Sequence, residues 1–154
     1  MNRILYMMRH ANAEDFTPSD IDRKISAYGK TEVEKLSQYM NVKKYFPERI
    51  LTSSAKRTQQ TSEILFGKDL NINSELYNSS VQQYLKIIKS QKSDLNSIGI
   101  VGHNPILSEL VRFLCHKLIL IDTCGIVVVE VKTDWDKINP STCLYKDYFS
   151  PSGL

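Results

Sequence analysis

The sequence is short of paired cysteines and long apolar runs. Its three cysteines, Cys115, Cys124 and Cys143, include no Cys-x-x-Cys pair, so neither a disulfide framework nor a zinc site is indicated. No apolar run approaches the roughly 20 residues of a membrane span. The apolar stretch Ile4–Met8 is also too short for the core of a signal peptide. We therefore expect reduced thiols in a cytoplasmic protein with no membrane partner.

The sequence also has little excess charge. Its 20 Lys and Arg residues and 17 Asp and Glu residues are interspersed and leave a net charge of +3. We interpret this balance as an ordinary solvated surface and expect no nucleic-acid partner. The three histidines lie at no ligand spacing, so we expect neither a metal nor a cofactor. A length of 154 residues with 42% hydrophobic content predicts one soluble domain over 1–154.

Strand-like and helix-like segments alternate along the chain, which predicts an α/β fold with a largely parallel sheet. We expect a polar loop over residues 11–25 after the first strand. Strands are expected at 3–9, 50–52, 70–77, 97–101, 125–131 and 142–148. Helices are expected at 27–40, 55–66, 79–90 and 105–117, with Ser26 capping the first and either Ser53 or Ser54 capping the second.

Polar clusters follow three of the predicted strands: Arg9-His10, Ser53-Ser54 and Gly102-His103-Asn104. The carboxyl ends of parallel strands meet at one edge of a sheet, where such folds bind ligands. Two of the clusters also precede helices, whose N-termini favour anions. Arg57 follows the second cluster by about one helical turn. The pattern therefore predicts two histidines and two arginines around one phosphoryl group.

Three motifs taken together resemble those of the histidine phosphatase superfamily, which includes phosphoglycerate mutases and acid phosphatases. They are the Arg9-His10 pair, the Ser-x-x-x-Arg-x-x-Gln-Thr-x-Glu pattern starting at Ser53, and the Gly-His-Asn-Pro segment at 102–105. The Arg-His-Ala-x-Ala form of 9–13 is most similar to phosphohistidine phosphatases of the SixA type, and segment 22–29 also resembles that family. The resemblance spans roughly residues 3 to 131 and implies a phosphoglycerate mutase-like, three-layer α/β/α sandwich with a mostly parallel central sheet.

The resemblance also implies residue roles in a metal-independent phosphatase. His10 would take the phosphoryl group onto a ring nitrogen and later pass it to water. Arg9 and Arg57 would hold the phosphoryl oxygens in forked pairs, and their charge would keep the His10 imidazole neutral. His103 would add positive charge or a hydrogen bond to the same oxygens.

Other candidate residues are less specific. Glu75 lies about where many relatives carry a general acid, while Glu14 and Asp15 are rivals for that role, and each could equally be a surface carboxylate. Three further side chains are candidate substrate ligands: Asn12, Asn104 and Ser53.

The sequence leaves the substrate open. Phosphohistidine on a protein, such as a histidine-phosphorylated signalling or transfer domain, is the favoured substrate, because no large insertion that would enclose a small metabolite is visible. The motifs do not separate this function from hydrolysis of a small phosphate ester. A non-catalytic phosphate-binding module is the third alternative.

Overall fold

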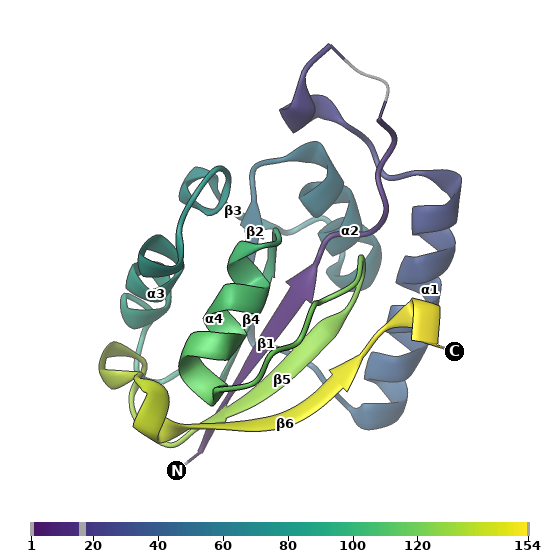
Figure 1. Ribbon diagram of the computed structural model, residues 1–154. Coiled ribbons are helices and arrows are strands. Elements are labelled where there is room, and N and C mark those ends of the chain that lie inside the picture. The colour runs from purple at the N-terminus through teal and green to yellow at the C-terminus, as the bar shows by residue number, and fades with distance from the viewer. Residues whose placement is uncertain (1, 16–17, 154) are drawn as a thin grey trace.

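The computed structural model describes residues 2–15 and 18–153 and places a six-stranded sheet between helices (Figure 1). The strands are β1 (Arg3–Arg9), β2 (Arg49–Ser53), β3 (Asn71–Asn73), β4 (Ser97–Gly102), β5 (Ile126–Val131) and β6 (Cys143–Phe149). The α-helices are α1 (Ala27–Lys43), α2 (Lys56–Phe66), α3 (Val81–Lys89) and α4 (Ile106–Cys115). Short 3₁₀ turns include η1 (Asp20–Asp22), η2 (Ser74–Leu76) and η5 (Pro151–Gly153).

The sheet is mostly parallel, as the sequence predicts. Its order is β3-β2-β4-β1-β5-β6. The first four strands in that order are parallel to one another, whereas β5 is antiparallel to both of its neighbours, β1 and β6. Arg9 lies opposite Gly102, and Thr52 lies opposite Val101. This register brings the carboxyl ends of β1, β2 and β4 to the same edge of the sheet.

Two apolar cores separate the three layers. Side chains alternate along β1, so that Leu5 and Met7 face one core while Tyr6 and Met8 face the other. Helices α3 and α4 cover the first face, and α1 and α2 cover the second (Figure 1). The first core takes the buried helix residues Tyr84, Ile87, Ile88, Leu107, Leu110, Val111 and Leu114. The second takes Val33, Leu36 and Met40. The three-layer sandwich is thus confirmed.

Most predicted elements are present, and the differences lie at their ends. The Ser26 hydroxyl caps α1 by accepting from the Gly29 N–H. The predicted serine cap of α2 is wrong, because Ala55 is the N-cap and no side chain caps that helix. The strand expected at 70–77 is only Asn71–Asn73. Of the loop expected at 11–25, residues 16 and 17 lie outside the described residues, and η1 occupies its second half.

The C-terminal segment completes the sheet edge. Strand β6 is the outer antiparallel strand, and η5 packs against α1 (Figure 1). The Ser150 and Ser152 hydroxyls both donate to the Asp122 carboxylate, which fastens the segment to the loop before β5. Over residues 2–15 and 18–153, none of the helices combines the length and apolar character needed to cross a membrane.

Candidate active site

A pocket of about 710 Å³ lies at the edge where β1, β2 and β4 end. The predicted residues Arg9, His10, Arg57 and His103 all line it. The remaining lining residues that the structure describes are Arg23, Tyr77, Asn78, Ser79, Ser80, Val81, Gln82, Asn104, Pro105, Ile106 and Glu109. A second hollow, of about 720 Å³, lies near the end of α1 and the start of β2 and contains none of the predicted site residues. The fold therefore brings the four principal candidates together.

His10 is held with one ring nitrogen available. Its backbone N–H donates to Gly102 and its carbonyl accepts from Cys124, so the residue is fixed between two strand ends. Its Nδ1 lies 2.7 Å from the Ala11 carbonyl oxygen. A carbonyl only accepts hydrogen bonds, so Nδ1 must carry the proton. The lone pair of a neutral ring is then on Nε2, to which the Arg57 Nε–H donates at 3.4 Å.

Burial and neighbouring charge keep both pocket histidines neutral. Burial is the main cause that lowers the pKa of His10 to about 3, with smaller contributions from His103, Arg57 and Arg9, while the Ala11 carbonyl opposes the shift. Burial and the Arg57 charge likewise lower the pKa of His103 to about 4. The two ring centroids are 5.4 Å apart. An empty pocket at neutral pH thus presents two uncharged imidazoles beside cationic arginines.

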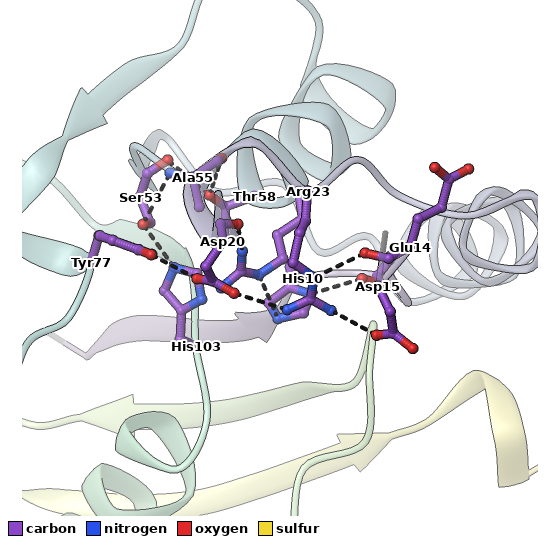
Figure 2. A network of polar contacts seen from close by, with 12 residues as sticks. His10, Glu14, Asp15, Asp20, Arg23, Ser53, Ala55, Thr58, Tyr77 and His103 are labelled. Carbon is purple, nitrogen blue, oxygen red and sulfur yellow. Dashed lines mark hydrogen bonds and ion pairs between the residues drawn. The ribbon is translucent and has the colours of Figure 1, made fainter. Parts of the chain in front are cut away.

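Arg57 is oriented by Asp20, a residue of η1. The Arg57 Nη1 donates to the Asp20 carbonyl at 2.8 Å, and its Nη2 pairs with Asp20 Oδ2 at 3.1 Å. The same carboxylate accepts from Tyr77 at 2.6 Å and from Arg23 at 3.0 Å. Figure 2 shows Asp20 among these contacts, close to Tyr77 and His103. Because Asp20 takes the far end of the guanidinium, the Nε edge of Arg57 faces His10.

Arg9 has an unused donor inside the protein. Its Nη1 donates to the Ile121 carbonyl at 2.9 Å, whereas its Nε is buried and has no hydrogen-bond partner among the described residues. Buried N–H groups normally have a partner. Arg9 also lines the pocket, so its guanidinium charge is available to an anion bound there.

His103 is positioned by two buried contacts. Its Nε2 lies 2.8 Å from the Ser53 hydroxyl, and its backbone N–H donates to the Tyr84 hydroxyl at 3.4 Å. The turn before it requires glycine, because a Cβ on Gly102 would lie 2.7 Å from the Tyr84 oxygen. With Nε2 engaged by Ser53, the other ring nitrogen of His103 faces the His10 side of the pocket (Figure 2).

The three predicted substrate ligands all form hydrogen bonds within the protein. Ser53 is fully buried, and its hydroxyl lies 2.8 Å from His103 Nε2. The Asn12 amide oxygen accepts from the Ser26 hydroxyl at the start of α1, and Asn12 does not line the pocket. Asn104 does line the pocket, but its amide bridges Ile121 and the Ser108 N–H. These side chains build the site rather than its anion-binding surface.

The three predicted acids lie outside the group around His10. Glu75 is exposed, bonds to Gln83 and lines a separate shallow hollow. The Glu14 carboxylate points away from the histidines (Figure 2), and Asp15 pairs with Arg23 at 3.5 Å. None of these three carboxylates therefore lies next to His10 as the expected general acid would.

Sequence reasoning missed three residues of the site: Asp20, Arg23 and Tyr77. Arg23 lies within segment 22–29, which already resembles the family, so its position was a usable signal. Asp20 and Tyr77 lie in irregular segments without periodicity. The Tyr77 ring stands edge-on to His103, with centroids 5.6 Å apart, and lies 6.0 Å from the Arg57 guanidinium carbon. Arg23 and Tyr77 line the pocket, and Asp20 links them to Arg57.

The Gln-Thr part of the second motif supports the loop that carries His10. The Thr61 hydroxyl accepts from the Ala11 N–H at 3.0 Å and donates to the Arg57 carbonyl at 2.8 Å. The Gln60 amide oxygen accepts from the Ile25 N–H. These contacts tie helix α2, which carries Arg57, to both ends of the loop after β1. Among residues 2–15 and 18–153, no three His, Cys, Asp or Glu side chains gather as a candidate metal site.

Comparison with known proteins agrees with this geometry. No family model matches the chain. An uncharacterized chloroplastic protein of Arabidopsis thaliana is 25% identical over 146 residues, which cover 84% of this chain and 67% of that protein. A solved structure assigned as the phosphohistidine phosphatase SixA of Agrobacterium tumefaciens is 26% identical, with a TM-score of 0.83, and covers 97% of this chain and 99% of its own.

Two further solved structures share the fold. One is assigned as the SixA phosphohistidine phosphatase of Nakamurella multipartitia, with 20% identity, coverage of 98% and 97%, and a TM-score of 0.90. The other is the protein histidine phosphatase SixA complexed with tungstate, with 22% identity, coverage of 98% and 99%, and a TM-score of 0.84. The chain therefore has the phosphoglycerate mutase-like fold of the histidine phosphatase superfamily and is similar, over nearly its whole length, to proteins of the SixA type.

Proposed function

We propose that the protein is a phosphatase that transfers a phosphoryl group to His10 Nε2 and then to water, with phosphohistidine on a protein as its substrate. One observation carries this proposal. The Nδ1–H of His10 donates to the Ala11 carbonyl, which directs the Nε2 lone pair into a pocket that also holds Arg9, Arg57 and His103. The similarity to SixA-type proteins supports the same reaction.

In the first step, the Nε2 lone pair forms a bond to phosphorus while the bond to the leaving group breaks. The electron pair of that bond stays with the leaving group. Positive charge develops on the His10 ring as the P–N bond forms, and the Ala11 carbonyl, which accepts the Nδ1–H at 2.7 Å, stabilises it. Arg9 and Arg57 line the same pocket and bring positive charge to the phosphoryl oxygens, and phosphoryl transfer depends mainly on such positioning and charge.

In the second step, the oxygen of a water molecule attacks phosphorus. The P–Nε2 bond breaks, its electron pair returns to Nε2, and the water proton passes to phosphate or solvent. Neutral imidazole is thereby restored, in agreement with a pKa of about 3 for His10 in the empty pocket. Dividing one displacement into two in this way is the usual benefit of covalent catalysis.

The leaving group favours a phosphohistidine substrate. Glu75, Glu14 and Asp15 lie away from His10, so a leaving alkoxide would receive no proton from them. When the second ring nitrogen of a phosphohistidine is protonated, the ring departs as neutral imidazole. Transfer from one imidazole to another then needs no general acid, which supports phosphohistidine as the substrate.

The test is phosphate release from a histidine-phosphorylated transfer domain and from a panel of small phosphomonoesters, compared by kcat/KM. We expect the protein substrate to have the higher kcat/KM. His10→Ala should lose turnover, whereas His116→Ala, at the end of α4 and outside the pocket, should keep it. Undiminished turnover by His10→Ala would refute the nucleophile, and a higher kcat/KM for a small ester would refute the substrate. Stoichiometric phosphate binding without turnover would indicate a non-catalytic module.

A further inference from the structure

A carboxylate lies beside the phosphoryl pocket. Asp20 is not itself a lining residue, but it bonds to three of them: Arg57, Arg23 and Tyr77. Its side chain is 51% exposed, so part of the charge faces solvent. Hydrogen bonds from Tyr77 and Arg23, together with Arg57, hold the pKa of Asp20 well below its usual range. The carboxylate therefore stays negatively charged throughout the physiological pH range.

The cations of the pocket are already partly neutralised. Both Nη groups of Arg57 are engaged by Asp20. Arg23 is shared between Asp20, Asp15 and the Glu14 carbonyl. Toward His10, Arg57 presents its Nε–H. The Asp20 carboxylate therefore offsets part of the positive charge that Arg57 and Arg23 would otherwise offer to a second anion.

The rest of the described lining adds no positive charge. The α3 side contributes Ser79, Ser80, Val81 and Gln82, and the α4 side contributes Ile106 and Glu109. Apart from Arg9, Arg23 and Arg57, the lining residues that the structure describes include no lysine or arginine, and Glu109 is acidic. Beyond these three arginines, a carboxylate or second phosphate carried near the reacting phosphorus would thus meet neutral or negative groups.

We propose that Asp20 is a specificity-determining residue that rejects phosphoryl donors with a second negative charge close to phosphorus. This inference rests on the proposed function and narrows its substrate class. Donors whose leaving group is uncharged, as the imidazole of phosphohistidine is, enter without repulsion. Phosphoglycerates, bisphosphates and other polyanionic metabolites are disfavoured.

The expected effect follows from Coulomb's law. Two unit charges about 7 Å apart, at an effective dielectric constant between about 40 and 80, change a dissociation constant about three- to sevenfold. Because the Asp20 side chain is half exposed, the upper part of this dielectric range applies and salt should screen the effect.

Binding of phosphonates tests the inference without turnover. The dissociation constants of phenylphosphonate and of its 3- and 4-carboxy derivatives are measured by titration calorimetry. We expect the wild type to bind phenylphosphonate more tightly, and Asp20→Asn to reduce this preference about three- to fourfold, the value for the upper part of the dielectric range. Intrinsic differences between the ligands cancel, because the same ligands are compared between variants.

Asp22→Asn is the matched control. It removes a carboxylate from the same 3₁₀ turn, at an exposed position. Unlike Asp20, the Asp22 carboxylate bonds to none of the lining residues that the structure describes, so the preference should be unchanged. As a measurement that needs no variant, the wild-type preference should shrink when salt is raised from about 0.05 M to about 0.5 M. An equal preference in Asp20→Asn and wild type, or a salt-independent preference, would overturn the role of Asp20.

Failure of this inference and failure of the proposed function are distinguishable. A protein that shows the Asp20-dependent preference but hydrolyses no phosphoryl donor refutes the phosphatase alone. A protein that hydrolyses phosphohistidine but shows the same preference with and without the Asp20 charge refutes the specificity role alone.

Discussion

Acid should destabilise this protein through the two histidines of the pocket. The usual pKa of both is 6.5, and in the folded protein it is lowered to about 3 for His10 and about 4 for His103. Below pH 6.5 the two histidines bind protons in the unfolded chain but stay neutral in the folded chain. Their contribution to stability is therefore fully present above pH 6.5 and is lost as the pH falls toward the pKa values of the folded state.

The size of this loss follows from the shifts. Each imidazole contributes about 1.4 kcal/mol per pH unit once the unfolded state is protonated. Together the two should remove up to about 5 kcal/mol between pH 7.5 and pH 4.5, a large part of the roughly 5–15 kcal/mol that stabilises a typical domain. Most carboxylates stay ionised over this window, so they add little to the slope.

Urea unfolding in phosphate-free buffer measures the slope, with the fluorescence of the single, fully buried Trp135 as the signal. The double variant His10→Gln, His103→Gln should lose the pH dependence, and His116→Gln should keep it. Inorganic phosphate should stabilise the wild type more at low pH, because a bound anion favours protonated imidazole. A wild-type slope no steeper than that of the double variant would refute the reasoning.

Three other predictions concern single contacts and metal. Ser53→Ala leaves the buried Nε2 of His103 without its partner and should cost about 1–3 kcal/mol in urea unfolding; phosphate release should fall as well, whereas Ser54→Ala should match the wild type in both. Arg57→Lys should lower kcat/KM for the phosphorylated domain by about 10²–10³, because one ammonium cannot hydrogen-bond to both Asp20 and His10 as the guanidinium does. A near-normal kcat/KM would contradict this role of Arg57. Turnover should survive EDTA, since arginines supply the positive charge, and its abolition would count against the mechanism.

The positions of the principal site residues could be predicted from the sequence because backbone topology places them. Arg9, His10 and His103 follow buried strands, and parallel strands end at one edge. Arg57 lies in the first turn of α2, which begins at the same edge of the sheet after β2. These inferences need only the chain direction and the period of each element.

The directions of smaller side chains could not be predicted in the same way. Ser53 lies at the predicted strand end, but its hydroxyl binds His103 because that ring packs against it. Asn12 is captured by the Ser26 cap of α1. The roles of Asp20 and Tyr77 depend on an irregular loop meeting a short 3₁₀ turn, and sequence periodicity carries no signal for such a contact.

The most direct test of the account is the site and regiochemistry of the covalent intermediate. The protein is mixed with a ³²P-labelled phosphohistidine donor, quenched in denaturing alkali during turnover, and mapped by mass spectrometry and NMR. We expect phosphate on the Nε2 atom of His10, because the Nδ1–H of that ring is bonded to the Ala11 carbonyl. Phosphate on Nδ1 or on another residue, or turnover with no phosphorylated protein at any time, would contradict it.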